Sequence, residues 1–422
     1  MISLSAAHAA TWLICALTVC GVVMRPWRTS EAVWAAGGAA ALVLSTLVSA
    51  ADALTAILKG TDVYLFLVGM MVLAEFARRE GLFDWLAEYA VRHARGSPAR
   101  LFLLVYLVGA AVTILLSNDA TAVVLTPAVC AATRRAGAHP LPYLFICAFI
   151  ANAASFVLPI SNPANLVVFG VHMPALAAWM AQFGLASAAS IVLTFLALRM
   201  TQRSALTEIV SSAGELPRLA CGGRVAAGGI AAAAVILLAA SALGWRLGAP
   251  TFVAGAVTGA AILIAKRESP VGALRGVSWS VLPLVAGLFV LAQGIENTDV
   301  LAPLVQRLSD SALSSPHATA LAAGGGIALV CNAVNNLPLG LIVGTIAHGA
   351  QLSPQIASAM LIGVDLGPNL SVTGSLATLL WLVALRREGQ EVSALEFLAV
   401  GCVVMPPALL ASLAIVSWVA PG

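Results

Sequence analysis

Long apolar segments, separated by short polar ones, run through the whole chain. A helix that crosses a bilayer needs roughly 20 apolar residues, and the sequence offers about ten such stretches. They lie at 8–24, 32–49, 61–78, 141–170, 175–198, 224–243, 249–265, 281–298, 354–385 and 395–419. This pattern predicts an all-α, polytopic membrane protein.

Two further apolar stretches, at about 101–133 and 317–349, are too long for one crossing, and each has a polar break in its middle. Arginines precede the first stretch, and Arg134 and Arg135 follow it. Because loops rich in Lys and Arg face the cytoplasm, both ends are expected on that side. We therefore predict a re-entrant hairpin with its tip at Ser117-Asn118-Asp119, and a second hairpin at the corresponding later stretch.

The distribution of positive charge supports this topology. With both hairpins in place, the N-terminus lies outside. Of the 21 Lys and Arg residues, 18 then lie on the cytoplasmic side, and only Lys59, Arg246 and Arg307 lie outside (21 − 18 = 3). Drawing either hairpin as a single crossing would reverse every later segment and remove this asymmetry. The expected location is the inner (plasma) membrane.

The two halves of the chain resemble each other. Residues 62–75 have the same pattern as residues 281–293, and the same register places Asn118 beside Asn336. Each half contains five crossings and one hairpin, and the topology gives the halves opposite orientations. This is the inverted-repeat plan of secondary transporters, in which the substrate binds near the membrane midplane between discontinuous helices.

Domain boundaries follow from the repeat. We predict a first inverted repeat over 1–198, a cytoplasmic linker over 199–223 and a second inverted repeat over 224–422. The linker is expected to be loose because it contains Gly214, Pro217, Gly222 and Gly223. Two short amphipathic segments, 82–95 and 300–312, are expected to lie along the membrane surface.

The composition argues against a soluble protein. Hydrophobic residues make up 61% of the chain and charged residues 9%, whereas soluble domains carry about 25% charged residues. No Rossmann, Walker or metalloprotease motif occurs, and no nucleophile–base or metal-ligand cluster emerges. We expect a transporter and not an enzyme, with no cofactor and no nucleic-acid partner. Transport would be secondary, or powered by a separate subunit.

Four polar breaks interrupt the apolar helices, two in each half, at 117–119, 159–165, 335–338 and 365–375. Proline and glycine free backbone groups there, which is costly in lipid unless those groups line a cavity. The structural alternative is that the breaks are helix kinks whose freed backbone groups are hydrogen-bonded by Ser and Asn side chains. Matching breaks in both halves instead favour a shared substrate or ion site. The candidate binding residues are Ser117, Asn118, Asn162, Asn165, Asn335, Asn336, Asn369, Thr373 and Ser375.

Two carboxylates in these breaks are candidates for proton coupling. A carboxylate inside the membrane is costly and marks a functional site by default, and Asp119 has no Lys or Arg beside it in the breaks. Burial favours its protonated form, so it can bind and release a proton, and it could also cap the second hairpin helix. Asp365 is the second candidate, with capping or bracing as its alternative role. Glu75, close to Arg78 and Arg79, is expected to form an ion pair at the cytoplasmic edge.

Three of these segments together resemble the arsenite/antimonite efflux permeases. They read LSNDATAVVLTP (116–127), SNPANL (161–166) and GVDLGPNLSVTGS (363–375). Those permeases belong to the ion transporter superfamily, with divalent-anion/sodium symporters, citrate carriers and some sodium/proton antiporters. The resemblance spans nearly the whole chain. It implies extrusion of a trivalent arsenic or antimony hydroxide, driven by protons alone or coupled to a separate cytosolic ATPase.

The residues are consistent with that substrate. Arsenous acid is largely neutral near neutral pH, and Asn amides and Ser/Thr hydroxyls can both donate to and accept from its hydroxyls. A dicarboxylate would call for a Lys or Arg clamp or bound sodium. The seven cysteines show no CxxC pairing, and only Cys331 lies near a break, so tight thiolate ligation is not expected. A sodium/proton antiporter and a passive channel subunit remain the rival hypotheses.

Overall fold

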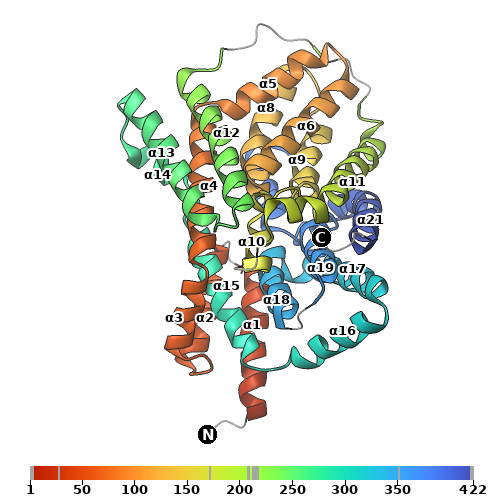
Figure 1. Cartoon of the computed structure of the whole chain (residues 1–422). Coiled ribbons are helices and arrows are strands. Elements are labelled where there is room, and N and C mark those ends of the chain that lie inside the picture. Colours follow the sequence, from red (N-terminus) through yellow and green to blue (C-terminus); the bar gives the residue numbers. More distant parts are fainter. Residues whose placement is uncertain are drawn as a thin grey trace.

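The computed structural model describes residues 4–26, 29–170, 173–206, 210–211, 218–349 and 352–418, and over these ranges it contains helices and no strands. Figure 1 shows an elongated molecule with the first helix at one end and the helices α5 and α8 at the other. The all-α prediction is confirmed.

In the first half, the long apolar segments form helices close to their predicted bounds. These helices are α1 (Leu4–Met24), α2 (Glu31–Leu44), α3 (Ala50–Lys59), α4 (Thr61–Arg79), α5 (Leu82–Ala94), α6 (Pro98–Leu115), α7 (Asn118–Ala120), α8 (Thr126–Arg135), α9 (Leu141–Ala153), α10 (Pro163–Phe169) and α11 (Leu176–Gln202). A π-helical turn, η2 (Thr121–Leu125), joins α7 to α8, and a 3₁₀ turn, η3 (Pro159–Ser161), precedes α10.

The second half has the same order of elements. Its helices are α12 (Cys221–Ala242), α13 (Gly248–Lys266), α14 (Pro270–Gly276), α15 (Val281–Glu296), α16 (Ala302–Ser314), α17 (Pro316–Val334), α18 (Asn336–Gly349), α19 (Pro354–Leu366), α20 (Leu376–Arg387) and α21 (Ala394–Trp418). A 3₁₀ turn, η5 (Gly367–Asn369), follows α19.

The register between the halves is constant over the hairpins. Helix α6 begins at Pro98 and α17 at Pro316 (316 − 98 = 218), and α7 begins at Asn118 and α18 at Asn336 (336 − 118 = 218). The short helices α3 and α14, which the apolar pattern did not predict, also take corresponding places. The opposite orientation of the two halves and the boundaries of the repeats stay predictions.

The chain reverses direction within the first predicted hairpin. Both of its ends are joined by hydrogen bonds to the same short segment: the Val210 N–H donates to the Gly96 carbonyl (3.3 Å) and the Ser211 N–H to the Ala136 carbonyl (2.8 Å). Arg135, at the end of α8, also pairs with Glu88 of α5, the helix that precedes α6. The start of α6 and the end of α8 therefore lie together, as a hairpin requires. How deep this hairpin reaches into a membrane stays a prediction.

Several helices can cross a membrane by length and hydropathy. There are six single ones within the described residues, α6, α11, α12, α13, α17 and α21, and up to eight if the bent pairs α3–α4 (48°) and α14–α15 (45°) each form one crossing. The described apolar parts of α1, α2, α9 and α18 are shorter. The chain is a multi-pass membrane protein. The number of ten crossings stays a prediction, since α6 and α17, predicted as hairpin arms, are among the six.

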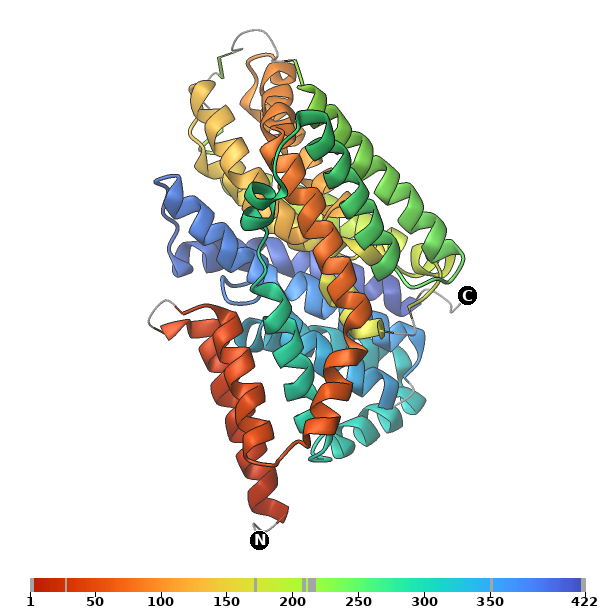
Figure 2. The same cartoon turned by 90° about the vertical axis from the view of Figure 1, so that its left-hand side faces the viewer.

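Close backbone contacts join the two halves. Figure 2 shows α4 running along the molecule beside α13, and a Cβ at Gly69 of α4 would overlap the Thr251 carbonyl of α13. In the same way, a Cβ at Gly287 of α15 would overlap the Ala35 carbonyl of α2. Small residues allow such close approach between helices in lipid. The two glycines hold the same register (287 − 69 = 218), so each half contributes one long helix to a matching interface.

Ion pairs lie at the end of α4. Glu75 accepts two hydrogen bonds from Arg78, at 2.8 and 2.7 Å, which confirms the predicted ion pair with Arg78 as the partner. Lys266 of α13 pairs with Glu80 at 2.8 Å, and Arg79 with Glu268 at 3.3 Å. These pairs fix α4 to the end of α13.

The loose-linker prediction is wrong at its C-terminal end. Gly222 and Gly223 lie in the first turn of α12, and a Cβ at Gly222 would overlap the Glu80 carboxylate. These glycines therefore serve helix packing and not chain flexibility. At the other end of the predicted linker, α11 continues to Gln202. Gly214 and Pro217 lie outside the described residues.

Candidate functional site

The tip of the first hairpin is a capped helix start. Ser117 is the N-cap residue of α7, and its hydroxyl accepts a hydrogen bond from the Ala120 N–H at 3.2 Å. The Asn118 side chain accepts from the Asp119 N–H at 2.9 Å. Asp119 therefore does not cap the helix, and within the described residues its half-buried carboxylate has no hydrogen-bond or ion-pair partner.

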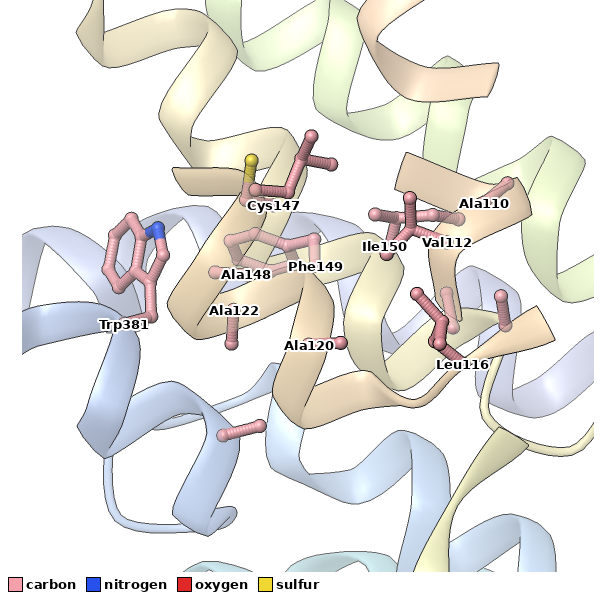
Figure 3. Close-up of a cluster of buried hydrophobic side chains, with 14 of the residues drawn as sticks. Ala110, Val112, Leu116, Ala120, Ala122, Cys147, Ala148, Phe149, Ile150 and Trp381 are labelled. Atoms are coloured by element: carbon pink, nitrogen blue, oxygen red, sulfur yellow. The ribbon is translucent and has the colours of Figure 1, made fainter. Parts of the chain in front are cut away.

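Apolar side chains hold this tip in place. Figure 3 shows Leu116 and Ala120 on the two sides of the turn, next to α9 with Phe149 and Ile150. Trp381 of α20 lies on the far side of α9, where its indole N–H donates to the Leu144 carbonyl at 3.0 Å. The tip of the first half is thus packed against a helix of the second half.

The break between α9 and α10 also ends in a capped helix start. Asn162 is the N-cap residue of α10, and its side-chain oxygen accepts from the Ala164 N–H at 3.0 Å. The Asn165 amide donates to the carbonyls of Ser155 (2.9 Å) and Leu158 (3.3 Å), which lie in the break after the end of α9. Asn165 therefore braces the break, as freed backbone groups in a membrane require.

The matching break between α19 and α20 follows the same plan. Ser375 is the N-cap residue of α20 and accepts from the Ala377 N–H at 3.1 Å. The Asn369 amide donates to the Phe149 carbonyl of α9 at 3.1 Å. The Thr373 hydroxyl donates to the Asn332 carbonyl at 2.6 Å, so it is held by the second hairpin.

The tip of the second hairpin contains a strained residue. Asn335 has a φ of 77°, a conformation that L-residues other than Gly rarely adopt. Its amide donates to the Thr373 carbonyl at 3.2 Å, which supports the turn. The next residue, Asn336, begins α18, and its buried side-chain oxygen has no hydrogen-bond partner within the described residues.

Hydrogen bonds between side chains bring the breaks of the two halves together. The Asn162 amide donates to Asp365 Oδ1 at 2.7 Å, and the Asn152 amide of α9 donates to Asn369 Oδ1 at 3.0 Å. Asp365 is fully buried, and its second oxygen has no hydrogen-bond partner within the described part of the chain. The network therefore contains four buried acceptor oxygens without a hydrogen-bond partner within the described residues, on Asp365, Asn336, Asn152 and Asn165.

Two asparagines that the sequence analysis did not single out belong to this network. Asn152 cross-links the halves as described, and Asn332 accepts from the Ser371 hydroxyl at 2.7 Å while donating to the Gly367 carbonyl at 3.1 Å. Both lie inside helices, close to the point where each helix ends at a break. A polar amide in an otherwise apolar helix was the available signal.

The electrostatics of the site come from helix ends and carboxylates. Helices α7, α10, α18 and α20 all begin at the breaks, so the positive ends of their dipoles lie there. A basic residue does lie on one side: Arg25 pairs with Glu31 at 2.9 Å, and Glu31 lines a void of about 10 Å³ together with Asn335. Because Glu31 neutralises it, Arg25 does not supply a free positive charge.

The cysteines form no metal site. The Cys331 thiol donates to the carbonyls of Val364 and Gly374, each at 3.4 Å. No cluster of three or more His, Cys, Asp or Glu side chains that could hold a metal occurs in the described ranges, and all seven cysteines are free. Cys331 therefore joins the second hairpin to the two ends of the neighbouring break.

A cavity of about 640 Å³ lies next to the site. Helices α10 and α18, which start at the breaks, line it with Leu166 and Leu341, and α15 lines it with Phe289, Gln293 and Glu296. Lys59, at the end of α3, also lines this cavity. A solute bound at the starts of α10 and α18 would therefore lie close to this cavity.

Comparison with known proteins places these features in a family context. The family model CitMHS, described as citrate transporter, matches residues 19–364. The arsenical pump membrane protein of Escherichia coli (strain K12) is 30% identical over 373 residues, which cover 82% of this chain and 84% of that protein.

Solved structures show the same fold. The YdaH transporter of Alcanivorax borkumensis superposes with a TM-score of 0.56 at 15% identity, covering 97% of each chain. Neisseria gonorrhoeae MtrF, from a class of antimetabolite efflux pumps, superposes with a TM-score of 0.55 at 14% identity, covering 98% of this chain and 95% of that one. At these identities the likeness concerns the fold alone.

Proposed function

Since the chain belongs to the citrate transporter family and, like the arsenical pump membrane proteins, to the ion transporter superfamily, we propose that it extrudes arsenite or antimonite in exchange for protons. The proposed mechanism is secondary transport by alternating access, around the site where the four breaks meet. The solute is the neutral trivalent hydroxide.

One observation carries this proposal: the breaks meet at buried acceptor oxygens and capped helix starts, with no free basic side chain among the described residues of the breaks. Asp365 Oδ2 and Asn336 Oδ1 are buried without a hydrogen-bond partner within the described residues. Such acceptors suit a solute that brings its own hydroxyl donors. A multiply charged carboxylate would need the Lys or Arg clamp that these breaks do not contain.

We assign each of the remaining candidate residues either to contact with the solute or to holding the shape of the breaks. Asn118, Asn336 and Asn162 are proposed to contact the solute, together with Thr373. Ser117 and Ser375 cap α7 and α20, and Asn165, Asn335 and Asn369 donate to backbone carbonyls. We propose that these five residues act on the solute through the shape of the breaks they hold.

Proton coupling is assigned to the two carboxylates. Asp119 lacks a partner among the described residues and Asp365 has one free oxygen there, so each can exchange a proton without breaking an ion pair. Exporting a neutral solute gains nothing from the membrane potential, whereas one inward proton per cycle adds about 2.3 kcal/mol per 100 mV. A cytosolic ATPase partner would be an additional source of energy and is not needed for this scheme.

A sodium/proton antiporter is the second candidate, because unpaired buried carboxylate and amide oxygens also suit a small hard cation. Transport into everted membrane vesicles separates the two. Vesicles with an imposed pH gradient are tested with arsenite, antimonite, sodium and citrate. We expect uphill uptake of arsenite or antimonite that collapses with the gradient and does not need sodium. Uptake of citrate or sodium alone would assign the site to another member of the superfamily.

A further inference from the structure

The cavity of about 640 Å³ is larger than the proposed solute needs, and the proposed mechanism leaves its wall residues without a role. Its wall is mostly apolar, with Lys59, Gln293, Glu296 and Thr345 as the polar side chains. In an apolar wall, a polar group that loses its partner is costly, because few other polar groups can replace that partner.

Helices α10 and α18 form one unit on one side of this cavity. A Cβ at Gly344 of α18 would lie 2.9 Å from the Val168 carbonyl oxygen of α10, so their backbones are in close contact. Figure 1 shows the two short helices next to each other, although one belongs to each half of the chain. Both begin at the candidate site, so a movement of this unit moves the site.

Among the described residues, one side-chain hydrogen bond connects this unit to α15 across the cavity. The Thr345 hydroxyl, next to Gly344, donates to Glu296 Oε1 at 2.8 Å. Between pairs of described residues, no other side-chain hydrogen bond and no ion pair joins α15 to α10 or α18. Lys59, the charged neighbour in the cavity, contacts Gln293 Oε1 at 3.4 Å and leaves Glu296 without an ion pair within the described ranges.

We propose that Glu296 is a positioning residue: through Thr345 it holds the α10–α18 unit against α15 and so sets how often this side of the transporter opens. The bond joins a carboxylate to a hydroxyl in a mostly apolar wall, where few neighbouring polar groups can replace it. Its loss shifts the equilibrium toward the separated state. The inference rests on the alternating access proposed above and not on the identity of the solute.

The test measures opening directly, by the labelling rate of a cysteine in the cavity wall. Leu341→Cys is introduced into the full chain after the exposed Cys20, Cys221 and Cys402 are replaced by Ser. Thr345→Val keeps the shape of the side chain and removes the donor, whereas Thr345→Ser keeps the donor. With a water-soluble maleimide, we expect Thr345→Val to label about fivefold faster, as the loss of one hydrogen bond predicts, and Thr345→Ser to label like the parent.

Variants of Glu296, the other partner of this hydrogen bond, test the proposal independently. Glu296→Gln keeps an acceptor and is expected to label like the parent, whereas Glu296→Leu is expected to label like Thr345→Val. The double variant Glu296→Leu/Thr345→Val should then label no faster than either single variant, because both remove the same bond. Additive rates, a parent-like Thr345→Val, or a Thr345→Ser that labels as fast as Thr345→Val would each overturn the proposal.

The readout is independent of the transported solute. If vesicle assays exclude arsenite but the labelling pattern holds, the positioning role stands and only the solute is wrong. If arsenite is transported but the labelling pattern fails, the solute stands and Glu296 has no positioning role.

Discussion

At the scale of residues, the two halves share a framework but differ in their acidic groups. Asp365 takes the place in α19 that Asn152 takes in α9, and Ser375 that of Asn162 (365 − 152 = 213; 375 − 162 = 213). Asp119 corresponds in the hairpin register to Leu337 (337 − 119 = 218). Each carboxylate is therefore matched by a side chain that cannot titrate. Each half therefore contributes one of the two carboxylates that are proposed to carry the proton.

The first prediction concerns Asp119. Asp119→Asn keeps the size of the side chain and removes the titratable group, and no hydrogen bond from a described residue to that carboxylate is lost. We expect proton-driven uphill uptake of arsenite into everted vesicles to be abolished, while downhill exchange remains detectable. Asp365→Asn, which resembles the first half, where Asn152 stands, is tested in parallel because it removes the second candidate proton carrier. Asp119→Asn vesicles that concentrate arsenite as steeply as wild type would move the proton carrier to Asp365.

A second prediction concerns solute contacts at the hairpin tips. Asn336 has a buried oxygen without a partner among the described residues, and Asn118 uses its side-chain oxygen for the start of α7. Asn336→Leu should therefore weaken arsenite transport roughly tenfold through loss of one or two hydrogen bonds, without loss of protein from the membrane. Asn118→Leu should weaken both transport and stability. Resistance of cells to arsenite, compared at equal membrane levels, is the measurement, and unchanged resistance in the double variant would remove both residues from the site.

At the scale of elements, the polar breaks were predictable because Pro, Gly and Asn seldom cluster in an apolar helix unless its backbone is interrupted there. The starts of α7, α10 and α18 lie within three of the predicted breaks, and α20 begins at Leu376, one residue after the fourth. The short helices α3 and α14 were not predicted, because each is too short to give an apolar period of its own. The partners of Asn162 and Asn369 were not predictable either, since Asp365 and Asn152 lie some 200 residues away in sequence, separations of 203 and 217.

The helix interface between the halves gives a third prediction. Gly69→Ala places a methyl group where the Thr251 carbonyl lies, so α4 and α13 must separate. We expect a loss of stability of about 1–3 kcal/mol, as overpacking in closely packed interiors produces. Gly37→Ala is the matched control, because a Cβ at Gly37 meets no atom within 4 Å. The measurement is the thermal unfolding of the detergent-purified protein, and equal midpoints for the two variants would contradict this interface.

At the scale of the whole molecule, two kinds of contact hold the helices together: close backbone packing and hydrogen bonds between side chains. Close backbone contacts join α4 to α13, α15 to α2 and α18 to α10, whereas side-chain hydrogen bonds join the start of α10 to α19 and α9 to η5. Helices in close backbone contact are expected to move as a unit, whereas hydrogen bonds between side chains can exchange partners. Under the proposed alternating access, we expect the α10–α18 unit to move relative to the two pairs of long helices, α4–α13 and α15–α2.

The last prediction concerns orientation, on which the direction of transport depends. The start of α6 and the end of α8 are both tied to residues 210–211, so we expect Arg95 and Arg135 to lie on one face of the membrane. The positive-inside rule makes that face cytoplasmic and places Lys59, in the wall of the large cavity, on the other.

Single cysteines replacing Arg95, Arg135 and Lys59 are labelled with a membrane-impermeant maleimide, in intact cells and in everted vesicles. We expect Lys59→Cys to react in cells, and Arg95→Cys and Arg135→Cys only in everted vesicles. If Arg95→Cys and Arg135→Cys react from opposite faces, the hairpin is wrong. If all three patterns are reversed, the hairpin stands, but the large cavity opens to the cytoplasm and Glu296 would control solute entry instead of release.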